Sequence, residues 1–171
     1  MPIDYKIVYL ADARELIVPL APMFIDEWEP YYGRQGPGDA ETDLNDCCNH
    51  DEIPLALVAI GEDKEILGTA ALKARSIDTH RHLSPWLAAM FVVERYRGQG
   101  IGVALIEEIE KNAIHLGYNR LYVGSGGVTT AMRTGGWAPI NEPEIMRGPI
   151  EIFERDLRGL NTLSASNTSK G

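Results

Sequence analysis

Three glycines at alternate positions separate a short apolar run from the clearest amphipathic pattern of the chain, in the segment Arg97-Gly98-Gln99-Gly100-Ile101-Gly102. Glycine lets the backbone approach a ligand closely and adopt conformations closed to other residues. The first N–H groups of a helix, at the positive end of its dipole, bind anions, and the Arg97 guanidinium suits phosphate. We therefore predict a phosphate-binding loop at Arg97–Gly102; the alternative is a tight strand-to-helix turn without a ligand.

Two other glycine motifs are excluded by their spacing. A dinucleotide fingerprint that starts at Gly98 needs a third glycine at position 103, where this chain has Val103. A phosphate loop of the Walker type needs Gly-Lys followed by Ser or Thr, and the chain contains no such triplet. The loop therefore belongs to neither of these classes.

The segments on either side of the loop predict the elements that position it. Trp86–Val93 is short and apolar throughout, as expected of a strand buried on both faces. Gly100–Leu116 carries apolar residues at helical spacing and ends at Gly117, a natural helix cap. The segment Arg120–Val123 then predicts a second strand, and a strand-helix-strand unit of this kind implies a right-handed parallel crossover.

The rest of the chain also alternates between strand and helix patterns, which predicts the α/β class. A helix that begins with Asp12 as its N-cap and runs to Tyr32 is expected to be kinked or split at Pro19 and Pro22. The other predicted helices are Ala40–His50 and Val128–Thr134, and the other predicted strands are Lys6–Leu10, Leu55–Ile60, Ile66–Ala74 and one or two within Ile145–Asp156.

Composition predicts one domain and excludes several classes of protein. The 171 residues, 44% hydrophobic and 24% charged, suit a single globular domain. We assign residues 1–160 to this domain and residues 161–171, which contain few apolar side chains, to a disordered tail. A net charge of −9, from 16 basic and 25 acidic residues, argues against binding to nucleic acid.

The cellular location follows from the termini, the apolar runs and the cysteines. No secretory signal precedes the first strand, and no apolar run approaches the ~20 residues that span a bilayer. The two cysteines, Cys47 and Cys48, are neighbours that rarely bridge. We therefore expect a cytoplasmic protein with reduced thiols and no membrane association.

The loop and its surroundings resemble a known family. Arg97–Gly102 resembles the Arg/Gln-x-x-Gly-x-Gly/Ala signature of the GNAT superfamily of acyl-CoA-dependent N-acyltransferases. Gly135-Gly136-Trp137 resembles the Gly-aromatic pair that follows the fourth helix of that family, and Ile152–Leu157 resembles its final strand. The resemblance covers about Tyr5 to Leu157, and the segment around Arg97 is the part that identifies the family.

The resemblance implies a single-domain fold and a mode of cofactor binding. The fold is a mixed central sheet flanked by helices, in which the strands Leu87–Val93 and Leu121–Val123 splay apart and admit the pantetheine arm of acetyl-CoA. A strand N–H beside the thioester would stabilise the oxyanion during direct transfer in a ternary complex. Main-chain groups of Phe91, Val92 and Val93 would pair with pantetheine, and N–H groups of Arg97, Gly98, Gln99, Gly100, Ile101 and Gly102 would bind the pyrophosphate.

The general acid and base are less clearly marked. Many members of the family place a tyrosine as the acid where this chain has Met132, and a thioether cannot donate a proton. Ser125, Thr129, Thr130 or water is then the candidate donor, and Asp78, His80 and His82 are the candidate bases. Each of these residues can instead be an ordinary solvated loop residue. The histidines and cysteines lack the spacing of a metal site, so no metal is predicted.

The acceptor side of the predicted site is acidic and aromatic. Glu27, Trp28 and Tyr31 lie within one short stretch, and carboxylates beside aromatic faces attract a cationic amine. The alternative is an amphipathic helix whose acidic side chains are solvated while Trp28 packs inward. The net negative charge also favours a basic acceptor.

Two functions stay open. The first is an acetyl-CoA-dependent N-acetyltransferase that acts on a primary amine of a small molecule or peptide. The second is a CoA-binding module with little or no transferase activity that serves as a sensor or partner, which Met132 favours. Members of the family are often dimers, so the resemblance also raises the hypothesis of a homodimer.

Overall fold

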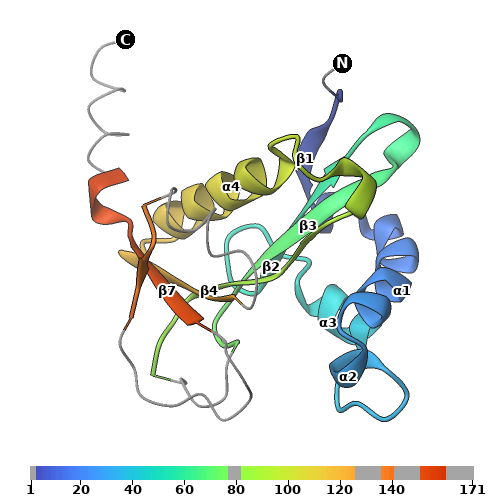
Figure 1. The fold of residues 1–171 in the computed structure, drawn as a ribbon, viewed down its shortest axis with the longest axis horizontal. Helices are drawn as coiled ribbons and strands as arrows, with labels where there is room; N and C mark the ends of the chain where they lie inside the picture. The colour runs from blue at the N-terminus through green and yellow to red at the C-terminus, as the bar shows by residue number, and fades with distance from the viewer. Residues whose placement is uncertain (1–2, 77–81, 126–135, 141–150, 161–171) are drawn as a thin grey trace. The chain divides into compact units, whose positions relative to one another are not determined.

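The computed structural model describes residues 3–76, 82–125, 136–140 and 151–160. Within them the strands form one mixed sheet in the order β1-β2-β3-β4-β5-β7-β6, flanked by helices (Figure 1). This architecture confirms the predicted α/β class. The strands are β1 (Lys6–Tyr9), β2 (Leu55–Ile60), β3 (Ile66–Lys73), β4 (Trp86–Val92), β5 (Arg120–Ser125), β6 (Ala138–Pro139) and β7 (Glu151–Asp156), and the helices are α1 (Ile17–Glu27), α2 (Glu29–Tyr32), α3 (Ala40–Asp46) and α4 (Ile101–His115).

The chain forms two compact units. The first comprises residues 1–71 and 89–105, and the second comprises residues 72–88 and 106–171. The chain therefore passes from the second unit into the first within β4 and returns to the second within α4. The end of β4, the glycine loop and the start of α4 all belong to the first unit.

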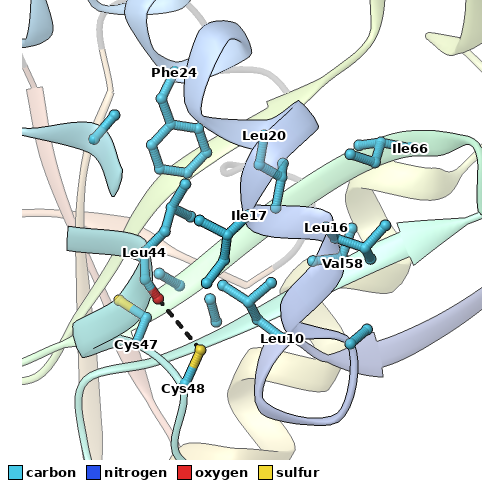
Figure 2. Packing of buried hydrophobic residues seen from close by; sticks show 14 of the residues in the cluster. Leu10, Leu16, Ile17, Leu20, Phe24, Leu44, Cys47, Cys48, Val58 and Ile66 are labelled. Atoms are coloured by element: carbon cyan, nitrogen blue, oxygen red, sulfur yellow. Dashed lines mark hydrogen bonds between the residues drawn. The ribbon is translucent and has the colours of Figure 1, made fainter. Parts of the chain in front are cut away.

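The core of the first unit lies between α1, α3 and the strands (Figure 2). Ile17, Leu20 and Phe24 recur at helical spacing along α1 and are buried, as is Leu44 of α3. β1 pairs with β2 in antiparallel register, and β2 is buried along its whole length. Two further members of this core are sulfur side chains, Cys47 and Cys48, which are 3% and 8% exposed.

The start of the first helix differs from the sequence prediction. Leu10–Asp12 and Arg14–Leu16 form 3₁₀ turns, and α1 begins at Ile17. The assignment of Asp12 as an N-cap is wrong because α1 begins five residues later, with Leu16 at the N-cap position. The Asp12 carboxylate instead contacts His50, with its Oδ1 2.7 Å from Nε2.

The break in the predicted Asp12–Tyr32 helix lies at Trp28, which has φ −127° and ψ 51° between α1 and α2. The prediction of a split is confirmed, but its placement at Pro19 and Pro22 is wrong. Pro19 occupies the first turn of α1, where a backbone N–H has no helical acceptor. Helix α1 continues through Pro22 and ends at Glu27.

Several other predicted bounds are close to those in the structure. Helix α4 matches the predicted Gly100–Leu116, and Gly117 follows it with φ 91°. Helix α3 is shorter than predicted, since it ends at Asp46; its N-cap is Asp39, whose Oδ1 accepts the Thr42 N–H at 3.1 Å. The predicted helix Val128–Thr134 and the tail at 161–171 lie outside the described residues.

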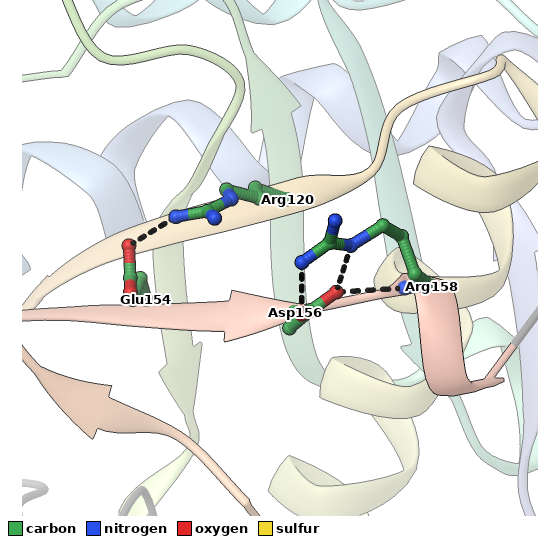
Figure 3. A network of polar contacts seen from close by, with 4 residues as sticks. All are labelled: Arg120, Glu154, Asp156 and Arg158. Carbon is green, nitrogen blue, oxygen red and sulfur yellow. Dashed lines mark hydrogen bonds and ion pairs between the residues drawn. The ribbon is translucent and has the colours of Figure 1, made fainter.

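The second unit contains the parallel pairing that the crossover predicted. β4 runs parallel to β5, with Trp86 opposite Tyr122 and Leu87 opposite Val123. β5 pairs in turn with β7 in antiparallel register. Figure 3 shows Arg120 Nη1 bonded to Glu154 Oε2 at 3.2 Å across β5 and β7. The Arg158 guanidinium and N–H hold the pKa of Asp156 well below its usual range.

No described helix combines the length and apolar character required to cross a bilayer.

The burial of β4 changes along the strand. Trp86 and Leu87, which pair with β5, are buried, whereas Ala88–Met90 are half-buried. The prediction that this strand is buried on both faces therefore holds for its beginning and is wrong for its middle.

Strands β3 and β4 approach each other unusually closely at Gly68. A Cβ atom at Gly68 would lie 2.8 Å from the Phe91 carbonyl oxygen and 3.3 Å from Val92 Cα. Only a hydrogen atom fits between β3 and the end of β4. An isolated glycine within a strand pattern is typical of such a contact.

Gly68→Ala should therefore lower the free energy of unfolding by about 1–3 kcal/mol, because the added methyl group displaces backbone. Gly61→Ala is the matched control, since its Cβ would meet its nearest neighbour, Leu67 Cδ2, at an ordinary 3.5 Å. We expect it to change stability by less than about 0.5 kcal/mol. Urea denaturation measures both variants, and equal midpoints would contradict the close approach.

Candidate functional site

The glycine loop has the backbone geometry that the sequence predicts. After β4, a 3₁₀ turn η5 covers Glu94–Tyr96, and α4 begins at Ile101. Gly98 and Gly100 have φ values of 78° and 85°, in the left-handed region that glycine adopts without steric cost. The Ala104 N–H donates to the Gly100 carbonyl at 3.0 Å. The N–H groups at positions 101–103 therefore precede the hydrogen-bond ladder of the helix and can bind a ligand.

The three glycines serve two different purposes. A Cβ at Gly98 or Gly100 would have no neighbour within 4 Å, so these two glycines are required by the backbone conformation and leave the loop open. A Cβ at Gly102 would lie 3.3 Å from Met90 Cε and 3.6 Å from Val92 Cγ2. Gly102 therefore allows the start of α4 to pack closely against β4.

Arg97 is held against the end of β4. Its Nε donates to the Val92 carbonyl at 2.8 Å, while the residue is exposed. The other guanidinium nitrogens can donate to a ligand, because a guanidinium carries five N–H groups in a planar fork. The structure thus places one oriented cation beside the open glycine loop.

The main-chain groups of Val92 and Val93, both predicted to pair with pantetheine, differ in the hydrogen bonds that they make within the chain. The Val93 N–H donates to the Leu67 carbonyl at 2.8 Å, and its carbonyl accepts the Tyr96 N–H at 2.8 Å. Along an extended strand, N–H groups alternate between the two edges. The Val92 N–H therefore points to the side of β4 opposite β3.

Sequence reasoning missed Ala89. This residue has φ 49° in the middle of β4, a conformation that costs a non-glycine residue about 1–3 kcal/mol and that recurs at functional sites. An irregularity of this kind re-aims the main-chain groups that follow it. Nothing in the surrounding alanines and methionine signals it in the sequence.

An aromatic cluster links the predicted acceptor residues to β4. The ring of Trp28 lies 5.2 Å from Phe24 and 5.7 Å from Phe91, both nearly perpendicular to it. Tyr31 is 48% exposed and packs edge-on against Tyr32 at 4.7 Å. Trp28 thus packs inward against the core while Glu27 is exposed, which are the features that the alternative, an amphipathic helix with solvated acidic side chains, predicts. The role of this stretch in binding an acceptor stays a prediction.

Tyr32 closes this cluster on the side of α3. Its hydroxyl donates to Asp43 Oδ2 at 2.8 Å. Burial, followed by that carboxylate, raises the pKa of Tyr32 far above its usual range, so it stays neutral near neutral pH. Glu27, the third predicted acceptor residue, is exposed at the end of α1.

The candidate acids and bases are only partly described. Asp78, His80 and Met132 lie outside the described residues. His82 is exposed in a turn before β4, and Ser125 is the last residue of β5. Within the described part of the chain, no group of three His, Cys, Asp or Glu side chains is placed to hold a metal ion.

The Gly136-Trp137 pair surrounds a buried ion pair in the second unit. Gly136 has φ 85°, and a Cβ there would overlap the Arg155 guanidinium. Trp137 is buried and hydrogen-bonds the Glu110 carboxyl group, whose Oε1 lies 3.8 Å from Arg155 Nε. Burial raises the pKa of Glu110, and the Arg155 charge opposes this shift. The glycine therefore makes room for the guanidinium.

Solved structures share this fold. An acetyltransferase of the GNAT family from Staphylococcus aureus Mu50 is 18% identical, with a TM-score of 0.67 over 91% of this chain and 100% of that one. An aminoglycoside 6'-N-acetyltransferase complexed with coenzyme A is 12% identical, with a TM-score of 0.70 over 89% and 97%. N-acetylglutamate synthase from Neisseria gonorrhoeae, complexed with coenzyme A and N-acetyl-glutamate, is 16% identical, with a TM-score of 0.62 over 92% and 36%.

Sequence comparison gives the family. No curated protein matches the chain significantly. The family model described as acetyltransferase (GNAT) family matches residues 20–132, which include α1 from Leu20 onward, the strands β2 to β5, the glycine loop and α4. This match covers more than half of the 171 residues. The chain therefore belongs to the GNAT acetyltransferase family.

Proposed function

We propose that this protein is an acetyl-CoA-dependent N-acetyltransferase that acts on a primary amine of a small molecule or peptide. The observation that carries the proposal is the open loop at positions 97–102, with two glycines in the left-handed region at the start of α4, in a member of the GNAT family. Two proteins of similar fold, the aminoglycoside acetyltransferase and N-acetylglutamate synthase, are complexed with coenzyme A.

The residues of the first unit fit this cosubstrate. The pyrophosphate is bound by the N–H groups at positions 101–103 and by the Arg97 guanidinium. These oriented donors are enough to bind an anion although the protein has a net charge of −9. The Val92 N–H, directed away from β3, pairs with the pantetheine arm. When bound, acetyl-CoA supplies the acetyl group as a thioester. The chain's own residues hold it at the loop and along the end of β4.

The acceptor lies beside the aromatic cluster in this proposal. Trp28 packs on Phe91 of β4, and the exposed Tyr31 ring and Glu27 carboxylate lie nearby in the sequence. Aromatic faces and carboxylates attract an ammonium group. Once the ammonium group has lost a proton, the free amine attacks the thioester carbonyl directly in a ternary complex. The carbon–sulfur bond breaks, and the thiolate of coenzyme A leaves and takes up a proton from water.

A second candidate function is a CoA-binding module with little or no transferase activity. Met132 at the position of the usual tyrosine favours it, since a thioether cannot protonate the departing thiolate. The two functions share the cofactor site and differ in turnover. One experiment therefore tests the cofactor, and a second separates the functions.

Gly100→Ala should raise the Kd of coenzyme A at least about tenfold, equivalent to about 1.4 kcal/mol, because a left-handed alanine distorts the loop. Gly117→Ala at the other end of α4 is the matched control: its φ is 91°, and a Cβ there also has no neighbour within 4 Å. It should carry the same backbone cost and retain the wild-type Kd. Isothermal titration calorimetry measures both, and absence of binding by the wild type would refute the proposal.

Incubation of the protein with acetyl-CoA and a panel of amines, aminoglycosides and peptides should yield a product heavier by one acetyl group, detected by mass spectrometry. For a cationic acceptor, Glu27→Gln or Tyr31→Ala should raise KM about threefold to tenfold with little effect on kcat, because both remove attraction for the ammonium group. Glu62→Gln, an exposed carboxylate of the β2–β3 turn, is the control. Coenzyme A binding without any acetylated product would favour the second function.

A further inference from the structure

The turn that carries the glycine loop is attached to the preceding hairpin by one carboxylate. Glu65 directly precedes β3, and its Oε1 accepts hydrogen bonds from Arg95 Nη2 and from the Tyr96 hydroxyl. Arg95 and Tyr96 belong to η5, between β4 and the loop. Both contacts go to the same oxygen atom, so a single atom holds two consecutive residues of the turn.

The main chain of Glu65 is itself held by hydrogen bonds within the hairpin turn. The Glu65 N–H donates to the Glu62 carbonyl at 3.0 Å, and the Glu65 carbonyl accepts the Gly61 N–H at 2.8 Å. Hydrogen bonds from Tyr96 and then Arg95 lower the pKa of Glu65, which keeps the carboxylate charged near neutral pH. The Arg95 guanidinium also lies 4.8 Å from the centre of the Tyr96 ring. Glu65, Arg95 and Tyr96 thus form one connected cluster, which we name the η5 anchor.

The η5 anchor lies one residue before the candidate ligand groups. Arg97 follows Tyr96 directly and bonds the Val92 carbonyl through Nε at 2.8 Å. The turn is therefore held from β3 by Glu65 and from β4 by Arg97. Because the Arg95 charge is paired with Glu65, Arg97 is the arginine of this segment that the structure leaves oriented for an anion.

We propose that Glu65 is a positioning residue for the cofactor site: through Arg95 and Tyr96 it fixes the turn at 94–97 and thereby the orientation of the loop that receives the pyrophosphate of coenzyme A. This inference rests on the proposed function. Glu65 itself does not touch the ligand. Its effect is on the affinity for any ligand that carries the pyrophosphate.

Because Arg95 and Tyr96 donate to the same Glu65 oxygen atom, substitutions at Glu65 and Tyr96 can remove both hydrogen bonds, one of them or neither. Glu65→Ala removes both contacts and should raise the Kd of coenzyme A about fivefold, a modest factor because the cluster is exposed. Glu65→Gln should stay within about twofold of the wild type, since its single carbonyl oxygen can still accept both hydrogen bonds. Tyr96→Phe removes one contact and should fall between them.

The control is the adjacent ion pair. Lys64 Nζ lies 2.6 Å from Glu15 Oε1, and both side chains are exposed. Glu15→Ala breaks an ion pair of the same hairpin turn without touching η5, so the Kd of coenzyme A should not change. Adenosine 3'-phosphate 5'-diphosphate, which carries the pyrophosphate without pantetheine, should lose the same factor as coenzyme A in Glu65→Ala.

The proposal is tested by calorimetric titration of the four variants with coenzyme A and by the melting temperatures of the ligand-free proteins. The proposal is supported by weakened binding in Glu65→Ala, rescue in Glu65→Gln and melting temperatures within a few degrees of the wild type. Wild-type affinity in both Glu65→Ala and Tyr96→Phe would overturn it, as would an equal loss in Glu15→Ala. Failure of the wild type to bind coenzyme A would instead refute the proposed function.

Discussion

The site depends on the contact between β3 and the end of β4. Because Gly68 has no side chain, the two backbones come close, and Val93 donates its N–H to Leu67. The Val93 carbonyl then accepts the first hydrogen bond of η5, and Arg97 reaches back to Val92. The position of the loop is therefore determined by the strands before it. Helix α4 follows the loop, so the position of its first N–H groups is set by the contacts of β3 and β4.

Net charge and local charge act on different ligands in this protein. The excess of nine negative charges would repel a polyanion at long range, but screening limits this effect to about 10 Å at ordinary ionic strength. At the loop, oriented N–H groups and one guanidinium act at hydrogen-bond distance. Glu65 neutralises Arg95 and so does not oppose Arg97 directly. The acidic surplus is consequently no obstacle to the proposed phosphate ligand, and it supports the proposal of a basic acceptor.

Features that depend on local sequence were predictable, and features that depend on distant contacts were not. The loop and α4 follow from glycine spacing and helical periodicity, and both match the structure. The placement of the helix break at Pro19 and Pro22 was wrong: the break lies at Trp28, whose ring packs on Phe24 and Phe91, and Pro30 occupies the first turn of the helix that follows. The positive φ of Ala89 has no signal in the sequence, because its neighbours are ordinary strand residues. Glu65 meets residues thirty positions away in the sequence, a contact that no local pattern records.

The burial of the two cysteines determines how turnover can be observed. Thiol reagents react with thiolates; Cys47 and Cys48 are nearly inaccessible, and burial raises the pKa of the Cys48 thiol. Coenzyme A released into solution carries an exposed thiol with an ordinary pKa near ~8.5. For the proposed reaction, a chromogenic disulfide reagent at neutral pH would therefore report the product thiol above a low protein background while the chain is folded. Unfolding exposes both cysteines, so the same reagent also counts the unfolded fraction.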